Sequence, residues 1–558
     1  MTKYITLFIF LLILSCKEDK TSKKNSGIVD KTAVDNTEVE APTGLSDIST
    51  KDFTEFKVLD SENLTKAEIW EAINPQMEDF TEEDYNRLKS SILEKDIRTL
   101  QKHRKAKKFN YEELTKFYLY RIRKFDRENA LALNSVIAIN PNCIEAAKAM
   151  DAAYVNKKWK HPVCGMPILL KDNINAANMP TTAGAVALKN NKTEDAFITN
   201  QLKSKGALIL GKANLSEWAY FFCGDCPSGY SAVGGQTLNP YGKRIFDTGG
   251  SSSGSGVSVT VNFCAAAIGS ETAGSILSPA SQNSVVGLKP TVGLVSRSGI
   301  VPISSTLDTA GPITRTVADN AIVLDAIYGY DNADSKSINP QWKPSYLTGN
   351  LSVTGLIGIR LGAPKRLVED TLYAKAIKVL KAQGAEIVEI EEQNIGLPNF
   401  IRLLNIDMKK DLPAYLENYA SNTITYKDVN DIMNFNNQDS TGTMPYGQKL
   451  FEGVASDMGD SEYLKQIKDT LKTNGRMYFD KPMTKHKLDG FLSINNYHAA
   501  FAAVAEYPAL TVPMGYTGKG EPKGLTFIAR SFQEKQLLQW AYAYEQASKK
   551  RIAPKSYN

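Results

Sequence analysis

Residues 247–290 decide the fold, and they read D-T-G-G-S-S-S-G-S-G-V-S-V-T-V-N-F-C-A-A-A-I-G-S-E-T-A-G-S-I-L-S-P-A-S-Q-N-S-V-V-G-L-K-P. Two turns rich in glycine and serine flank an apolar run at residues 257–268, which predicts either a buried helix or a buried strand. Glycine lets consecutive backbone N–H groups point into one concavity, here beside serine hydroxyls. Acyl transfer needs both, as a nucleophile and as donors to the developing oxyanion. The stretch therefore predicts an acyl-transfer site.

Other interpretations of the stretch are a linker, a phosphate loop and a nucleophile elbow. A Gly/Ser linker does not carry apolar runs on both sides, and the phosphate-loop pattern G-x-x-x-x-G-K-[ST] is absent from the sequence. Residues 250–254 read G-S-S-S-G and match the elbow pattern G-x-S-x-G, with Ser252 as nucleophile. An elbow also needs a histidine, and His486 and His498 follow the serine in the right order. A Ser-His-Asp esterase is therefore the alternative mechanism.

The two turns resemble the signature of the amidase signature family, which runs GGSSGGS…GTDTGGSIRxPAS. The variant E-T-A-G-S-I-L-S-P-A, and V-G-L-K-P-T-V-G-L-V-S-R-S-G-I after it, are most similar to the peptide-amidase-like branch. The resemblance extends over residues 80–553. It implies an α/β fold in which helices cover both faces of a large, twisted, mixed β-sheet, and we assign this domain to residues 61–555.

The resemblance also implies a Ser–cisSer–Lys mechanism without a metal or an organic cofactor. The nucleophile falls on Ser275, the bridging serine on Ser251 and the lysine on Lys171. The oxyanion donors fall on the backbone N–H groups of the nucleophile turn. These are Thr272, Ala273 and Gly274, together with Ser275 itself. The implied substrate is a linear carboxamide, either the C-terminal amide of a peptide or a similar small amide.

From the residues alone, Lys171 has a simpler interpretation. It ends an apolar stretch at residues 167–171 that predicts a buried strand, and a buried ammonium group must be paired or neutral. A salt bridge to Asp172 satisfies that requirement without any catalytic role. The two signature serines favour catalysis instead.

Three positions differ from the commonest family pattern. Glu271 stands where aspartate is usual, Ala273 where glycine is usual and Leu277 where arginine is usual. A Cβ atom at position 273 disfavours some backbone angles that an oxyanion turn can require. Leu277 argues against the tRNA-dependent amidotransferase subunit, whose pattern keeps the arginine. An inactive, amidase-like binding lipoprotein is the alternative function, and it predicts loss of catalytic residues that are present here.

The first residues predict an export signal. Lys3 precedes an apolar run at residues 5–14 that is too short to span a bilayer, and Ile13-Leu14-Ser15-Cys16 resembles a lipobox. We expect a lipoprotein signal at residues 1–16, lipid on Cys16 and a disordered tether at residues 17–60. The alternative is an ordinary secretory signal. We therefore expect a lipoprotein of the cell envelope, periplasmic or associated with the outer membrane, whose only membrane contact is the lipid.

Charge and cysteines identify no further partner. The 558 residues carry a formal net charge of +5, and the basic run at residues 102–108 lacks interleaved aromatics. It predicts a solvated helix end rather than a nucleic-acid site. Cys223 and Cys226 form a C-x-x-C motif that lacks a second ligand pair at zinc spacing. A disulfide and two free thiols both remain open there.

The rest of the chain alternates between helical and strand-like segments, as expected of an α/β fold. Residues 394–481 are polar and helix-prone, match the family least and, by the resemblance, border the substrate entrance. The expected helices are residues 80–125, 199–205 and 537–547, and the further expected strands are residues 207–212, 356–359, 385–388 and 507–513.

Overall fold

The computed structural model describes residues 56–127, 130–155, 161–339, 349 and 351–557. The predicted signal segment, Cys16 and the predicted tether up to residue 55 lie outside these residues. The last tether residues contact the folded chain, because the backbone N–H groups of Lys57 and Val58 donate to the Tyr446 hydroxyl at 3.0 and 3.4 Å. Nearby, Asn63 Nδ2 donates to the Gly442 carbonyl at 2.7 Å.

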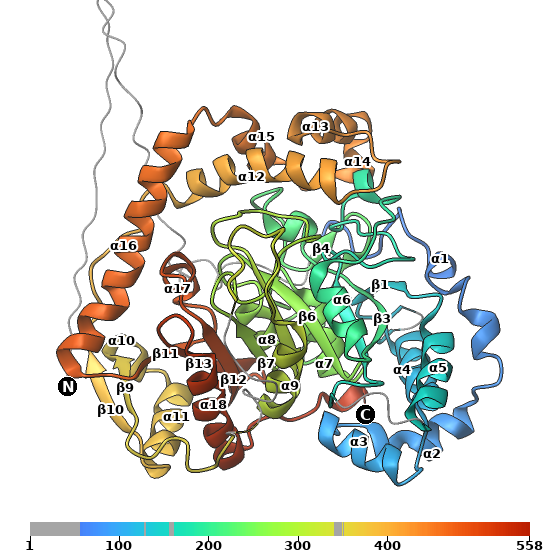
Figure 1. Cartoon of the computed structure of the whole chain (residues 1–558), viewed down its shortest axis with the longest axis horizontal. Coiled ribbons are helices and arrows are strands. Elements are labelled where there is room, and N and C mark those ends of the chain that lie inside the picture. The colour runs from blue at the N-terminus through green and yellow to red at the C-terminus, as the bar shows by residue number, and fades with distance from the viewer. Residues whose placement is uncertain (1–55, 128–129, 156–160, 340–348, 350, 558) are drawn as a thin grey trace, which may run out of the picture. The chain divides into compact units, whose positions relative to one another are not determined.

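One 11-stranded sheet forms the core, with strand order β1-β3-β2-β6-β8-β7-β12-β13-β11-β9-β10 (Figure 1). Its middle is antiparallel from β6 to β11, whereas the pairs β3–β2, β2–β6, β11–β9 and β9–β10 are parallel. The strands are β1 (Val136–Ile139), β2 (Pro167–Lys171), β3 (Leu208–Ala213), β6 (Ala266–Glu271), β7 (Val286–Lys289), β8 (Thr309–Thr314), β9 (Arg360–Pro364), β10 (Glu386–Ile390), β11 (Gly490–Ile494), β12 (Ala509–Tyr516) and β13 (Pro522–Ile528).

Helices pack on both faces of the sheet, which confirms the predicted fold class. On one face α7 (Ser253–Thr260) packs against α8 (Leu277–Gln282); on the other, α9 (Val317–Ile327) packs against α18 (Glu534–Ser548). The outer helices around them are α1 (Lys66–Trp70), α2 (Glu82–Ile92), α3 (Ile97–Lys105), α4 (Tyr111–Phe125), α5 (Cys143–Val155), α6 (Phe197–Ser204), α10 (Lys365–Val368), α11 (Thr371–Ala382) and α17 (Ala499–Val504). The basic run overlaps the last turn of α3, where cations stabilise a helix end.

The apolar run at residues 257–268 contains both of the structures that its composition allows. Helix α7 ends at Thr260, and strand β6 begins at Ala266. All eight residues of α7 are buried, so this helix has no polar face that would have distinguished it from a strand. A Cβ atom on Gly254 would stand 2.3 Å from the Ser135 carbonyl oxygen, so only glycine allows α7 to lie this close to its neighbour.

The prediction of a strand at residues 356–359 is wrong. Residues 356–358 form a turn, and the strand begins at Arg360. Gly358 has φ +75°, outside the strand region, and Ile357 is 65% exposed. The apolar composition predicted a buried strand, but the turn at Gly358 leaves the Ile357 side chain exposed to solvent.

Residues 394–481 are largely helical, as expected, and we call helices α12–α16 the cap helices. They are α12 (Phe400–Asn418), α13 (Val429–Gln438), α14 (Ser440–Thr443), α15 (Lys449–Ser456) and α16 (Ser461–His486). In Figure 1 α12–α15 lie across the top, and α16 runs down the left side. Their apolar side chains form a cluster separate from the main core. Phe451 is central to it, with ring centroids 5.2 Å from Trp218 and 5.1 Å from Phe222. None of the helices in the described ranges is long and apolar enough to cross a membrane.

Candidate active site

Lys171 lies at the end of β2, fully buried, with its side-chain nitrogen among hydroxyl and carbonyl oxygens. Its Nζ is 2.7 Å from Ser251 Oγ, 3.0 Å from Ser270 Oγ and 3.1 Å from the Ser270 carbonyl oxygen. Ser270 belongs to β6, the strand next to β2, so sheet pairing itself brings these two residues together.

The alternative salt bridge to Asp172 does not form. The Asp172 carboxylate is 3.0 Å from Lys212 Nζ on β3 and also accepts from the Thr182 hydroxyl and backbone N–H. No carboxylate within the described chain forms an ion pair with Lys171.

Burial dominates the electrostatics of Lys171. Removal from water lowers the pKa of Lys171 to about 7, against the opposing attraction of the Asp308 and Glu271 carboxylates. A neutral amine has two N–H donors and one lone pair. The donors match the two oxygens of Ser270, and the lone pair then accepts the proton of Ser251. The geometry therefore suits a neutral lysine that acts as a base.

Ser251 follows a cis peptide bond from Gly250 and is fully buried. Its carbonyl oxygen accepts from the Ser216 backbone N–H at 3.0 Å. One residue further, the N–H of Ser252 donates to the carbonyl oxygen of Ser275 at 3.2 Å. The two signature turns are thus joined directly at the serines that the sequence singled out.

Ser275 lies between β6 and α8 and is partly exposed. Its hydroxyl makes no hydrogen bond to any residue that the structure describes. The link from Lys171 to Ser251 is therefore present, whereas no hydrogen bond joins Ser251 to the Ser275 hydroxyl. Catalytic hydrogen bonds of this kind commonly tighten only when substrate binds.

Glu271 fixes the backbone of the residues that follow Ser275 in the chain. Its Oε2 accepts from the N–H groups of Ile276 at 2.7 Å and Leu277 at 3.0 Å, and the Gly274 N–H also faces this carboxylate. Burial raises the pKa of Glu271, and the nearby Lys289 opposes that shift. The glutamate that replaces the usual aspartate therefore holds the turn through its Oε2 atom.

The other two departures from the family pattern are accommodated. The left-handed angle of the turn falls on Gly274, with φ +113°, whereas Ala273 has no positive φ. The Cβ atom of Ala273 therefore brings no strain. Leu277 is fully buried in an apolar cluster with Phe479 and Ala499, where an arginine would lack a partner.

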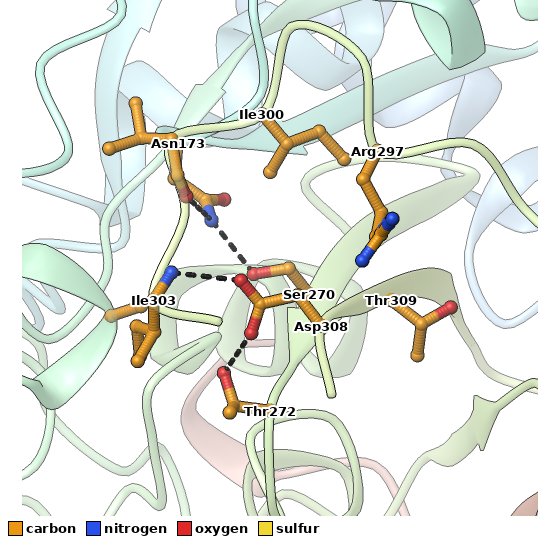
Figure 2. Close-up of a pocket in the computed structure, with 10 residues that line it drawn as sticks. Asn173, Ser270, Thr272, Arg297, Ile300, Ile303, Asp308 and Thr309 are labelled. Atoms are coloured by element: carbon orange, nitrogen blue, oxygen red, sulfur yellow. Dashed lines mark hydrogen bonds between the residues drawn. The ribbon is translucent and has the colours of Figure 1, made fainter. Parts of the chain in front are cut away.

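Asp308 holds the nucleophile turn through a hydrogen bond from Thr272. It accepts from Thr272 Oγ1 at 2.5 Å and from the backbone N–H of Ile303 at 2.8 Å, and burial raises the pKa of Asp308 to about 6 (Figure 2). Asn173 Nδ2 donates to Ser270 Oγ at 2.9 Å across the same small cavity, whose volume is about 10 Å³. The sequence alone assigned neither Asp308 nor Asn173 a role at this site.

The elbow alternative lacks its base. Ser252 Oγ is buried and is bonded to the backbone of Ser270, at 3.1 Å to the carbonyl oxygen and 3.2 Å from the N–H. The ring of His498 is held by Ser493 and Glu392, and the ring of His486 makes no hydrogen bond to the described chain. Neither histidine contacts Ser252.

The two cysteines of the C-x-x-C motif, Cys223 and Cys226, form a disulfide rather than two free thiols. Both cysteines are buried in the same apolar cluster as the cap helices, beside Trp218 and Phe222. The disulfide lies beside the cap helices, and neither cysteine is bonded to Lys171. Among the described residues, no group of three or more His, Cys, Asp or Glu side chains is arranged to hold a metal ion.

Known proteins resemble this chain both in sequence and in structure. The family model described as Amidase matches residues 113–472. A probable amidase of Arabidopsis thaliana is 36% identical over 485 residues, which cover 83% of this chain and 92% of the relative. An amidase family protein from Bacillus anthracis has a TM-score of 0.85 at 38% identity, over 89% of this chain and 100% of that one. The native peptide amidase from Stenotrophomonas maltophilia has a TM-score of 0.78 at 38% identity, over 83% and 98%.

Proposed function

The chain belongs to the amidase family and hydrolyses amides, and from that premise we propose that it cleaves a linear carboxamide through Lys171, Ser251 and Ser275. The observation that carries the proposal is the 2.7 Å contact between the buried Lys171 Nζ and Ser251 Oγ, in a setting that favours a neutral amine. A neutral lysine with no carboxylate partner is the base that a serine relay requires.

In this mechanism Lys171 takes the proton of Ser251, and Ser251 takes the proton of Ser275. The Ser275 oxygen attacks the amide carbonyl and forms a tetrahedral intermediate. The relayed proton returns to the leaving nitrogen, so ammonia departs and an acyl-enzyme remains. Water then attacks the ester, and the same groups act in reverse to release the carboxylic acid.

The oxyanion donors are backbone N–H groups of the nucleophile turn. Those of Thr272, Ala273 and Ser275 have no acceptor in the part of the chain that the structure describes. The N–H of Gly274, which the resemblance also assigns to the oxyanion, faces Glu271 and is the weaker candidate. Donors fixed in this way stabilise the developing charge without reorganising.

We further propose that the substrate is the C-terminal amide of a short peptide or a similar small amide. The support is the likeness to a peptide amidase over most of both chains, together with the peptide-amidase-like sequence around Ser275. Ammonia release from amidated dipeptides, free glutamine, aryl amides and long-chain fatty amides tests this substrate. Turnover of aryl or fatty amides without amidated dipeptides would contradict the substrate and leave the mechanism standing.

The export proposal rests on sequence alone. We propose that Cys16 carries lipid and attaches the enzyme to the cell envelope. Cells that express the full chain should incorporate labelled palmitate into it, and the Cys16→Ala variant should not. Label in that variant would contradict the lipoprotein assignment.

A further inference from the structure

The loop that follows β11 places Asn496 against the nucleophile turn. Asn496 Nδ2 lies 3.1 Å from the point where a Cβ atom on Gly274 would stand, and Asn496 is partly exposed. Its carboxamide makes no hydrogen bond to any residue in the described ranges. A polar side chain beside the turn, with donors and an acceptor uncommitted, is available to a bound molecule.

The residue before it shows the opposite arrangement. Asn495 is buried, its Oδ1 accepts from the Gly524 N–H at 2.7 Å, and its carbonyl oxygen accepts from Thr526 Oγ1 at 2.5 Å. Both partners belong to β13. Asn495 therefore fixes the base of the loop to the sheet, and Asn496 is the one of the pair that is left free to bind.

The other end of the loop is fixed by His498. Its ring lies between Ser493 Oγ at 2.6 Å and Glu392 Oε1 at 2.9 Å, and Glu392 also accepts from Arg366 and Tyr478. Ser493 is fully buried, so this Ser-His-Glu row supports the loop and is no second hydrolytic site. Anchors on both sides hold Asn496 in place before any substrate arrives.

We propose that Asn496 is a specificity-determining residue that hydrogen-bonds the peptide group next to the scissile amide. A carboxamide has donors and an acceptor, which match the C=O and N–H of a peptide unit. Because the loop is already ordered, little conformational entropy is lost on binding. This inference rests on the proposed function, since it concerns a substrate with a peptide group beside the amide that is cleaved.

The test compares an amidated dipeptide with propionamide, which has the scissile group but no peptide group. In Asn496→Ala and Asn496→Leu, kcat/KM for the amidated dipeptide should fall about 10- to 100-fold, the usual effect of removing a substrate hydrogen bond. The value for propionamide should change less than about threefold. Asn496→Asp keeps an acceptor but loses the donors and should lie between. The matched control is Asn430→Ala, at an exposed asparagine on α13.

The outcomes separate the two proposals. Equal losses on both substrates would place Asn496 in the general chemistry or the fold and would overturn the inference. Unchanged values on both substrates would overturn it as well. A wild-type enzyme that hydrolyses propionamide but no amidated dipeptide would instead remove the proposed substrate class, and the inference with it. Equal thermal melting of the variants and the wild type checks that the fold is intact.

Discussion

The nucleophile region and the cap helices are stabilised in different ways. Around Lys171 and Ser251 the residues are buried, and their polar atoms are bonded to the backbone of β6 and of the signature turns. The cap helices instead pack through apolar side chains, Phe451 among them. A hydrogen-bonded site tolerates little change, because any lost partner leaves a buried polar atom unsatisfied. An apolar cluster tolerates substitution if its volume is kept.

The two regions are linked at one loop. Ser304 Oγ donates to Asp407 at 2.5 Å, and the Ser305 N–H donates to Asp411 at 2.6 Å, both on α12. The same loop carries Asp308, which accepts from Thr272 in the nucleophile turn. The structure thus has two layers, a hydrogen-bonded nucleophile region and an apolar cap, joined where α12 contacts this loop. The following experiments test whether the two layers act separately.

The largest effect is expected from Ser275→Ala. It removes the attacking hydroxyl, so kcat should fall by about 10⁴- to 10⁶-fold. Because that hydroxyl makes no hydrogen bond in the described structure, thermal melting should stay the same. Steady-state ammonia release measures this change. Ser278→Ala, at a partly exposed serine one turn further on, is the control and should keep its activity. An unchanged rate in Ser275→Ala would return the nucleophile to Ser252.

A second large effect concerns pH. Because burial lowers the pKa of Lys171 to about 7, the active neutral form is lost below that pH, and activity should fall about tenfold per pH unit there. In the unfolded chain the lysine has a pKa near 10.5, so the unfolded state binds more protons between pH 7 and 10.5. This group's contribution to the unfolding free energy therefore rises with pH across that window.

Lys171→Met tests both parts of this pH argument. It should abolish turnover, and the unfolding free energy should depend less on pH between 7 and 10.5 than it does in the wild type. A pH profile of kcat/KM and urea unfolding at several pH values measure the two effects. Loss of activity in His498→Ala, together with a disappearance of the pH dependence, would contradict the lysine assignment.

A smaller effect on chemistry is expected in the cap. Phe451→Ala opens a cavity in the apolar cluster and should lower the unfolding free energy by about 3–5 kcal/mol. Turnover of propionamide should remain within about threefold, because no group bonded to Lys171 or Ser251 changes. Met458→Ala, at a methionine that is 87% exposed, is the control. A collapse of propionamide turnover in a variant that is still folded would show that the two layers are not separable.

The smallest effect is expected from the disulfide. Replacing Cys223 and Cys226 by serine should lower the unfolding free energy by about 2 kcal/mol, since the closed loop is short. The kcat for small amides should not change, because the disulfide contributes nothing to the Lys171 contacts. Thermal melting of the wild type with and without a reductant gives the matched measurement. A large loss of kcat in the reduced enzyme would place this loop in the catalytic layer.

The predictable parts of the fold were those with a strong local signal. Residues 167–170 are all apolar, and the buried strand predicted there is β2, which ends at the charged Lys171. The run at residues 257–268 stayed ambiguous, since a fully buried helix has no amphipathic pattern. At residues 356–359 the prediction was wrong, because the geometry at Gly358 overrode the apolar composition.

At the candidate site, the family motifs located Lys171, Ser251 and Ser275, and the structure brings their segments together. The partners that tune them were not predictable. Ser270 reaches Lys171 only because β6 pairs with β2, and Asn496 reaches Gly274 from more than 200 residues away. Such contacts depend on strand order, which a single sequence does not display locally.

The contacts of Lys57, Val58 and Asn63 have a mechanical consequence. These residues are bonded to Tyr446 and Gly442, so the chain joins the folded domain beside the cap helices, and the Leu59 carbonyl oxygen between them accepts from the Gln236 N–H at 2.8 Å. Any force or tether applied upstream of residue 56 would enter the molecule there.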